Sequence, residues 1–235
     1  MPPPDAMSSQ PSLDRLRFNM IEQQIRPWDV LDLEILDLLA VVRREEFVPP
    51  HHRGLAFADM MIPLRGSLEE AMHTGQVMLE PKMEARLLQE VNPKRHEKVL
   101  EVGAGSGYMA ALLGARAQRV VSLEIDPELA RMARENLQRA GVRNVEVREA
   151  DGARGLAAEG PFDVIVLSGS VAEVPAALVQ QLKVGGRLVT IVGDEPVMRA
   201  TLVTRTGDTA TTTAQRWDTM APRLLHFPAP SRFKF

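Results

Sequence analysis

The sequence predicts an α/β fold with a doubly wound, mostly parallel sheet and antiparallel C-terminal strands. Between residues 82 and 195, short apolar runs alternate with segments of helical periodicity, as expected for strands joined by crossover helices. A glycine-rich turn follows the first apolar run. Beyond that region, Thr- and Val-rich runs surround Gly207 and Asp208, a pattern typical of a β-hairpin.

Residues 13–81 are expected to form a helical cap and an active-site lid. A helical stripe of apolar residues begins at Leu13 and ends before Pro27. Asp29 is expected to cap a second helix. After Pro50 the sequence loses its periodicity, and an irregular stretch of this length in a compact domain is usually functional.

The region 82–195 is expected to be the cofactor-binding core. The expected parallel strands are 98–102, 120–125, 145–148, 162–167 and 187–192. The expected helices are 107–116, 127–140 and 173–182. Pro127 at a helix start and Gly141 after its end fit the usual helix boundaries. Residues 196–235 are expected to add an antiparallel hairpin that completes the sheet, and residues 1–12, rich in Pro and Ser, a disordered lead-in.

Composition excludes several classes of protein. The chain has 235 residues, of which 45% are hydrophobic, enough for one sizeable core. Its formal net charge of −3 offers no basic excess for nucleic acid, and no apolar run approaches the ~20 residues of a membrane helix. Cysteine is absent, so disulfides and thiolate chemistry are excluded. We therefore expect a cytoplasmic protein.

The strongest motif is the sequence VLEVGAGSG, which ends at Gly107. Glycines after a strand let the backbone approach a ligand closely, and the following helix offers free N–H groups. The spacing is not that of a dinucleotide fingerprint, because Tyr108 occupies the place of the third glycine. A phosphate loop is excluded because no Lys-Ser/Thr pair follows. Glu101 at the strand end would repel a pyrophosphate but suits the ammonium group of a methionine moiety.

Two further acids follow the next two strands. Glu124, 21 residues beyond Gly103, can accept hydrogen bonds from both ribose hydroxyls, and Asp151 can accept from an adenine amino group, with Gly152 keeping the wall thin. The expected cofactor is S-adenosyl-L-methionine, with S-adenosyl-L-homocysteine as product. The expected binding residues are Glu101, Gly103, Ala104, Gly105, Gly107, Glu124, Ile125, Asp151 and Gly152.

The chain resembles the protein-L-isoaspartate O-methyltransferase family over about residues 18–195. The matching stretches are MIEQQI at 20–25, REEFVP at 44–49, LAFAD at 55–59, IPL at 62–64, EVGAGSGY at 101–108, DG at 151–152 and QLKVGGRL at 181–188. The resemblance implies a Rossmann-like S-adenosylmethionine-dependent fold. It also implies protein repair by methylation of the stray carboxylate of L-isoaspartyl residues.

One segment departs from the family. The family carries Gln-Thr-Ile-Ser-Gln/Ala-Pro over its active site, and its Ser is treated as catalytic. Here Gln76 and Pro81 match, but Leu79 occupies the Ser position and cannot donate a hydrogen bond. Glu80 is interpreted either as a base for a hydroxyl or amine acceptor or as an acid in the first helical turn. Gln76, Leu79 and Glu80 are therefore the lid candidates, and the catalytic residue is left unassigned.

Three functions stay open: an isoaspartyl methyltransferase with an altered lid, a methyltransferase acting on another protein or small molecule, and a cofactor-binding protein without activity. Neither the methyl acceptor nor the oligomeric state follows from the sequence. His51 and His52 are adjacent and have no third ligand nearby, so no metal site is expected. Trp28, Trp217 and Tyr108 are expected to be packing residues.

Overall fold

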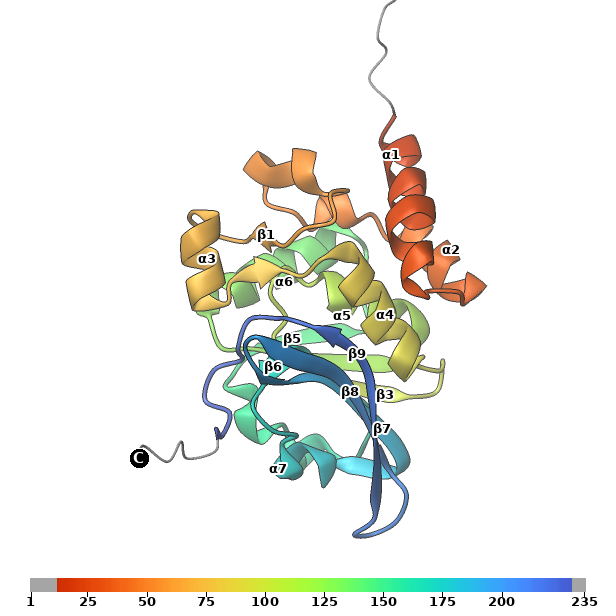
Figure 1. The fold of residues 1–235 in the computed structure, drawn as a ribbon, viewed down its shortest axis with the longest axis vertical. Coiled ribbons are helices and arrows are strands. Elements are labelled where there is room, and N and C mark those ends of the chain that lie inside the picture. Colours follow the sequence, from red (N-terminus) through yellow and green to blue (C-terminus); the bar gives the residue numbers. More distant parts are fainter. Residues whose placement is uncertain (1–11, 230–235) are drawn as a thin grey trace, which may run out of the picture.

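A computed structural model describes residues 12–229, and its centre is a seven-stranded sheet (Figure 1). The strand order is β5-β4-β3-β6-β7-β8-β9. The strands are β3 (Lys98–Val102), β4 (Arg119–Glu124), β5 (Val145–Glu149), β6 (Phe162–Val171), β7 (Leu182–Asp194), β8 (Val197–Arg205) and β9 (Thr211–Thr219). The first five strands in this order pair in parallel, and the last two are antiparallel. The expected fold class is thus confirmed. All but the last residue of the expected lead-in, and the last six residues of the chain, lie outside the described range.

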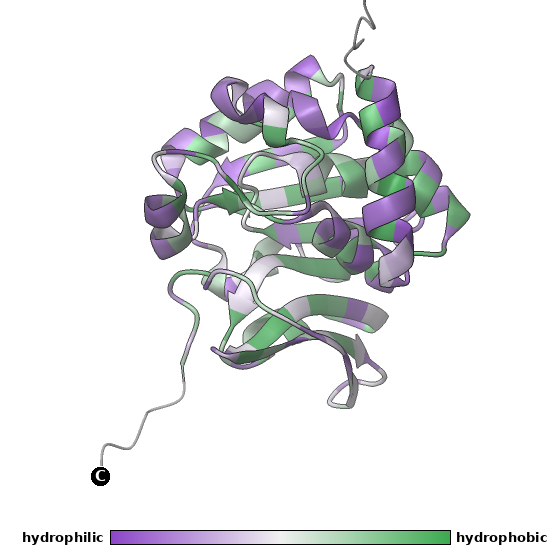
Figure 2. Ribbon diagram, turned by 45° about the horizontal axis from the view of Figure 1, so that its top comes forward, coloured by the Kyte–Doolittle hydropathy of each residue, from purple (hydrophilic) through white to green (hydrophobic). Residues whose placement is uncertain are grey.

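The central strands are buried on both faces, as their uninterrupted apolar sequences predict. In β3, Val99 packs into one hydrophobic cluster and Leu100 into another on the opposite face, because successive side chains of a strand alternate. Figure 2 shows the central strands largely in the colour of hydrophobic residues. The sheet therefore separates two cores.

Three helices cover the first face: α4 (Pro81–Val91), α5 (Tyr108–Arg116) and α6 (Pro127–Arg139) (Figure 1). The helix α6 begins where the sequence predicts, with Pro127 at its first position and the Asp126 carboxylate accepting from the N–H of Glu128 at 2.9 Å. The expected helices on this face are confirmed within one residue at each end. No helix within residues 12–229 is both long and apolar enough to cross a membrane.

The opposite face is covered more thinly than expected. The predicted helix 173–182 is reduced to one turn, α7 (Ala176–Val179). Pro175 disfavours helical geometry in the residue before it, and the chain enters β7 at Leu182, so little length is left for a helix. The hydrophobic side chains of Leu224 and Phe227, from beyond the last strand, pack against this face instead.

The N-terminal cap holds one correction. The helix α1 (Leu13–Met20) continues as a π-helical turn to Ile25, so the predicted stripe is helical throughout. The second helix, α2 (Leu33–Val41), is capped by Asp32 rather than by Asp29. Asp29 has a φ of 63°, in the left-handed region, whereas a capping residue needs extended backbone.

The lid consists of two short strands joined by a helix. The strands β1 (Ile62–Pro63) and β2 (Val77–Met78) pair antiparallel, and α3 (Leu68–Thr74) lies between them. Ser67 and Glu70 form a capping box at the start of α3, in which each side chain accepts from the other residue's backbone N–H. The sequence identified this region only as irregular.

A buried arginine joins the cap, the lid and the core. Arg44 is fully buried, and its guanidinium donates to the backbone oxygens of Ala56 at 3.1 Å and Leu79 at 2.5 Å. It is also paired with the buried carboxylate of Glu84 on α4, and it lies over the ring of Tyr108 on α5 at 5.2 Å from the centroid. Burial raises the pKa of Glu84 to about 7, against the opposing effect of Arg44.

We expect Arg44→Met to lower the free energy of unfolding by about 3–5 kcal/mol, because the Glu84 carboxylate and two backbone oxygens then stay buried without a donor. The loss should be larger at about pH 8 than at about pH 6, where protonation of Glu84 relieves part of it. The matched control is Arg43→Met, whose side chain is 61% exposed, and which should change stability by about 0.5 kcal/mol or less. Urea unfolding of the three proteins measures both values, and equal midpoints for the two variants would contradict the role of Arg44.

Candidate functional site

A cavity of about 330 Å³ lies at the carboxyl edge of the parallel strands. The chain runs from β3 to β4 and β5 on one side, then returns to β6 on the other side of β3. Doubly wound sheets bind ligands at this reversal of strand order. The walls come from the lid, the glycine loop, the ends of β4 and β5, and the chain that follows the last strand.

The glycine loop adopts backbone geometry that only glycine tolerates well. Gly103, Gly105 and Gly107 have φ values of 91°, 51° and 85°. Gly103 and Gly105 line the cavity. Gly107 does not, because it packs where α5 meets α6, with Ala133 3.2 Å from the position of a Cβ. Ala104 lines a separate space of about 20 Å³ on the lid side of the loop.

Glu124, at the end of β4, holds the loop from the cavity wall. Its carboxylate accepts from the N–H of Gly105 at 2.8 Å and from the N–H of Asp126 at 3.0 Å. Burial raises the pKa of Glu124, and the two backbone donors act against that shift. Ile125 also lines the cavity. The carboxylate is thus fixed in orientation and faces the site.

Glu101 lies beneath the cavity and is not one of the residues that line the cavity. It is fully buried, and the hydroxyls of Ser122 and Ser168 donate to its carboxylate at 2.6 and 2.9 Å. Burial raises the pKa of Glu101 to about 7. Ser168 does line the cavity, at an irregularity in β6 between Val166 and Ser170. Ser168 is not among the binding residues expected from the sequence.

Asp151 lines the cavity but already has two partners. Its carboxylate accepts from the N–H of Ala153 at 2.9 Å and contacts Nδ1 of His226 at 2.8 Å. The hydrogen bond from Ala153 lowers the pKa of Asp151, and His226 adds to that shift. Gly152 keeps the wall thin, since a Cβ there would lie 2.3 Å from Val102. A larger residue at position 152 would therefore collide with Val102.

The contact with His226 belongs to a C-terminal strap, residues 221–229, which the sequence analysis missed. The strap lies along β6, where Ser170 donates its N–H to Pro222 at 2.8 Å and accepts from the N–H of Leu224 at 2.9 Å. Residues 223–227 form part of the cavity wall. The one available signal was a pair of leucines and a phenylalanine after the last predicted strand, apolar residues without an element to join.

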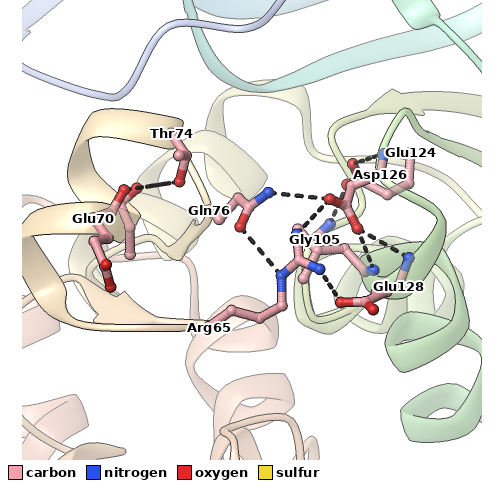
Figure 3. A network of polar contacts seen from close by, with 10 residues as sticks. Arg65, Glu70, Thr74, Gln76, Gly105, Glu124, Asp126 and Glu128 are labelled. Atoms are coloured by element: carbon pink, nitrogen blue, oxygen red, sulfur yellow. Dashed lines mark hydrogen bonds and ion pairs between the residues drawn. The ribbon is translucent and has the colours of Figure 1, made fainter.

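The lid is tied to the opposite rim by a polar network (Figure 3). Gln76 accepts from Arg65 at 3.2 Å and donates to Asp126 at 3.1 Å. The Arg65 guanidinium also pairs with Asp126 at 2.5 Å and with Glu128. Gln76 therefore lines the cavity as a bridging residue between the lid and the start of α6.

The remaining lid candidates occupy different surroundings. Leu79 is buried and lines the small space beside Gly103 and Ser168. Glu80 is the residue before α4, with Pro81 at the first helical position. It lines neither of the two spaces beside the glycine loop, and instead faces a groove on the outer side of α4.

Among the described residues, no group of three or more His, Asp or Glu side chains is arranged to hold a metal ion. Tyr108 is buried and packs against Phe47, as expected of a packing residue. Trp217 is half-buried against the core, but Trp28 is 44% exposed, so the expectation of packing was wrong for Trp28.

Comparison with known proteins gives one consistent family. The sequence profile described as protein-L-isoaspartate(D-aspartate) O-methyltransferase matches residues 17–220. A protein-L-isoaspartate O-methyltransferase from Koribacter versatilis is 41% identical over 194 residues, covering 83% of this chain and 82% of the relative. One from Marinobacter nauticus is 40% identical over 197 residues, covering 83% and 86%.

A solved structure also has the same fold. A structure from Plasmodium falciparum, described as a protein-L-isoaspartate O-methyltransferase in complex with S-adenosyl-L-homocysteine, superposes with a TM-score of 0.73 at 19% identity. It covers 92% of this chain and 99% of its own. The match to the family profile and the two relatives show that the chain belongs to the protein-L-isoaspartate(D-aspartate) O-methyltransferase family.

Proposed function

We propose that the protein transfers a methyl group from S-adenosylmethionine to a carboxylate of a protein acceptor, at the small space beneath Leu79. The observation that carries this proposal is the convergence of Glu124, Asp151 and Ser168 with the glycine loop around one cavity. Members of this family are O-methyltransferases, and their methyl donor is S-adenosylmethionine. We also propose a cytoplasmic location, since a chain without cysteine suits a reducing compartment.

The residues present fit this cofactor. Glu124 would accept from the ribose hydroxyls, Asp151 from the adenine amino group, and Ser168, backed by Glu101, would meet the ammonium group. The sulfonium supplies an electrophilic methyl group. An acceptor carboxylate is ionised at neutral pH and needs no general base, so the chain's own contribution is alignment and exclusion of water.

The lid favours a change in acceptor recognition. Leu79 lines the space next to Gly103 and Ser168, where a hydroxyl at its position would face an acceptor carboxylate. Its neighbours Val77 and Met78 line the same space and are also apolar. A second candidate function is therefore methyl transfer to an acceptor that needs no hydroxyl from the lid.

We expect Glu124→Ala to weaken S-adenosylmethionine binding about tenfold to a hundredfold, because charge-assisted hydrogen bonds worth about 1.5–3 kcal/mol are lost. Calorimetry at about millimolar ligand measures the affinity. Glu135→Ala is the control, since that carboxylate is 54% exposed on the outer side of α6. Absence of heat from the folded wild-type protein would refute the cofactor proposal itself.

We expect the free protein to lose stability as pH rises from about 4.5 to about 7. The pKa of Glu101 is about 7 in the folded protein and about 4.5 in the unfolded chain. Between these pH values only the unfolded chain loses this proton, so its free energy falls relative to that of the folded protein. Glu101→Gln should reduce this slope and stabilise the protein at about pH 8 by on the order of 1–3 kcal/mol. The slope should not vanish, because Glu84 titrates in the same window.

The measurement is chemical denaturation across this pH range, with Glu135→Gln as the control that leaves the slope unchanged. A nearby ammonium group favours the ionised form of Glu101, so cofactor affinity should rise over the same pH interval. A stability that rises between about pH 5 and pH 7 in the wild type, and does so equally in Glu101→Gln, would contradict the burial effect.

We expect weak transfer to isoaspartyl peptides and a gain of about tenfold to a hundredfold in Leu79→Ser, since one hydrogen bond to a charged acceptor is restored. A radiolabelled methyl-transfer assay on an isoaspartyl peptide and its aspartyl twin measures this. Leu68→Ser, at a side chain 43% exposed on α3, is the control. A wild-type rate near ~10 per second on the isoaspartyl peptide would overturn this interpretation of the lid.

A further inference from the structure

A groove of about 220 Å³ lies on the outer side of α4, and we call it the tryptophan groove. Its defining side chains are Trp28, Glu80, Lys82, Arg86 and Trp217, and it is also lined by Asp218, whose carboxylate accepts from Arg199 at 2.8 Å. Each tryptophan carries a cation on its face. Lys82 Nζ is 4.3 Å from the centre of the Trp28 ring, and the Arg86 guanidinium is 3.9 Å from that of Trp217. These are the two tryptophans of the chain.

Arg86 has fewer hydrogen-bond acceptors around it than a guanidinium with so little exposed surface usually has. Its side chain is 14% exposed, yet it makes no hydrogen bond to any residue between 12 and 229, and its nearest carboxylate oxygen, of Asp29, is 3.9 Å away. Arg187 is similarly exposed, at 18%, but donates to both Glu97 oxygens and to two backbone oxygens. The burial of Arg86 also lowers its pKa. Arg86 therefore lies over the Trp217 ring with its N–H groups available to an anion.

The exposed Trp28 is also fixed in place. Lys82 spans from its ring to Asp59, where its ammonium group pairs with the carboxylate at 2.8 Å. At the other end of the groove, the half-buried Glu80 has no hydrogen-bond partner for its side chain among the described residues. Glu80 precedes Arg86 by six residues, which is about 9 Å along α4. An acidic group bound at Arg86 thus lies well away from Glu80.

The groove lies next to the proposed transfer site. Leu79 lines the space beside Gly103 and Ser168, and the next residue, Glu80, lines the groove. Neighbouring Cα atoms are about 3.8 Å apart, so the linings of the two sites begin on adjacent residues of one segment, and an extended acceptor chain along this segment would contact both. Glu80 can accept a main-chain N–H from such a chain.

We propose that the tryptophan groove binds an acidic side chain of the polypeptide that is methylated, a few residues from the methylated carboxylate, with Arg86 as the binding residue. This inference rests on the proposed function for the identity of the occupant. The unmade hydrogen bonds of Arg86 and Glu80 carry it, because a polypeptide carboxylate supplies the acceptors that Arg86 lacks and the chain beside it supplies the donor that Glu80 lacks. The groove then selects among acceptors by their sequence.

Tryptophan fluorescence reports occupancy directly, because both tryptophans line the groove. The probes are acetyl-Ala-isoAsp-Gly-Ala-Glu-Ala-amide, variants with the Glu one to four residues from the isoAsp on either side, and the twin with Gln in place of Glu. None of these peptides contains an aromatic residue. We expect the best Glu peptide to bind about tenfold more tightly than its Gln twin, with a change in fluorescence.

Arg86→Gln should reduce the preference for Glu to within about twofold, and Arg86→Lys should leave an intermediate preference because it keeps the charge but loses the planar fork. The control is Arg131→Gln, at a side chain 65% exposed on α6, which should keep the full preference. Thermal unfolding checks that the Arg86 variants are folded. For peptides that are methylated, the acidic residue should lower KM and leave kcat unchanged.

The proposal is overturned if Glu and Gln peptides bind the wild type equally, if neither binds, or if the preference survives in Arg86→Gln. Binding is read without methyl transfer, so the two proposals fail separately. A Glu preference that depends on Arg86, in a protein that transfers no methyl group, supports the groove and rejects only the proposed reaction. Methyl transfer without any Glu preference rejects the groove alone.

Discussion

The placement of the lid depends on one buried cation. The Arg44 guanidinium is fully buried, so the fold must surround its N–H groups with acceptors. It finds them in three separate parts of the chain: a backbone oxygen of the cap, the carboxylate of Glu84 in α4, and the backbone oxygen of Leu79 in the lid. The last contact fixes Leu79 over the glycine loop. The side chain proposed to face the acceptor is thus positioned by the hydrogen-bonding needs of a buried cation.

Below the glycine loop, the buried carboxyl group of Glu101 is a second electrostatic feature of the fold. Glu101 is fully buried between two serine hydroxyls, where its proton is retained up to about neutral pH. A positive group near Ser168 would favour the ionised form, since opposite charges stabilise each other most where the dielectric constant is low. The buried acid therefore provides a charge that becomes favourable when the cation of a ligand arrives.

The rim of the cavity is held differently from its floor. The lid contacts the start of α6 through Arg65, and the C-terminal strap contacts Asp151 through His226. Both contacts are partly exposed to solvent, and an exposed ion pair such as that of Arg65 contributes about 1 kcal/mol or less. The floor consists instead of buried strand ends and a glycine loop. Buried residues below the cavity and weaker contacts around its opening suit the proposed binding of a cofactor and a protein acceptor.

The sequence by itself determined the class of sheet, the position of the glycine loop and the acids at the strand ends, because these follow from local periodicity and from residues next to each strand. Two predictions from the sequence were wrong. The cap of α2 was predicted at Asp29, whose left-handed backbone depends on the preceding turn. The helix α7 was predicted too long, because its end is set by where β7 pairs with β6. Only the tertiary structure decided which groups meet. The strap over Asp151, the serines around Glu101 and the groove of Trp28 and Arg86 join residues tens to about two hundred positions apart. Such contacts arise from packing of the whole chain, and no local pattern records them.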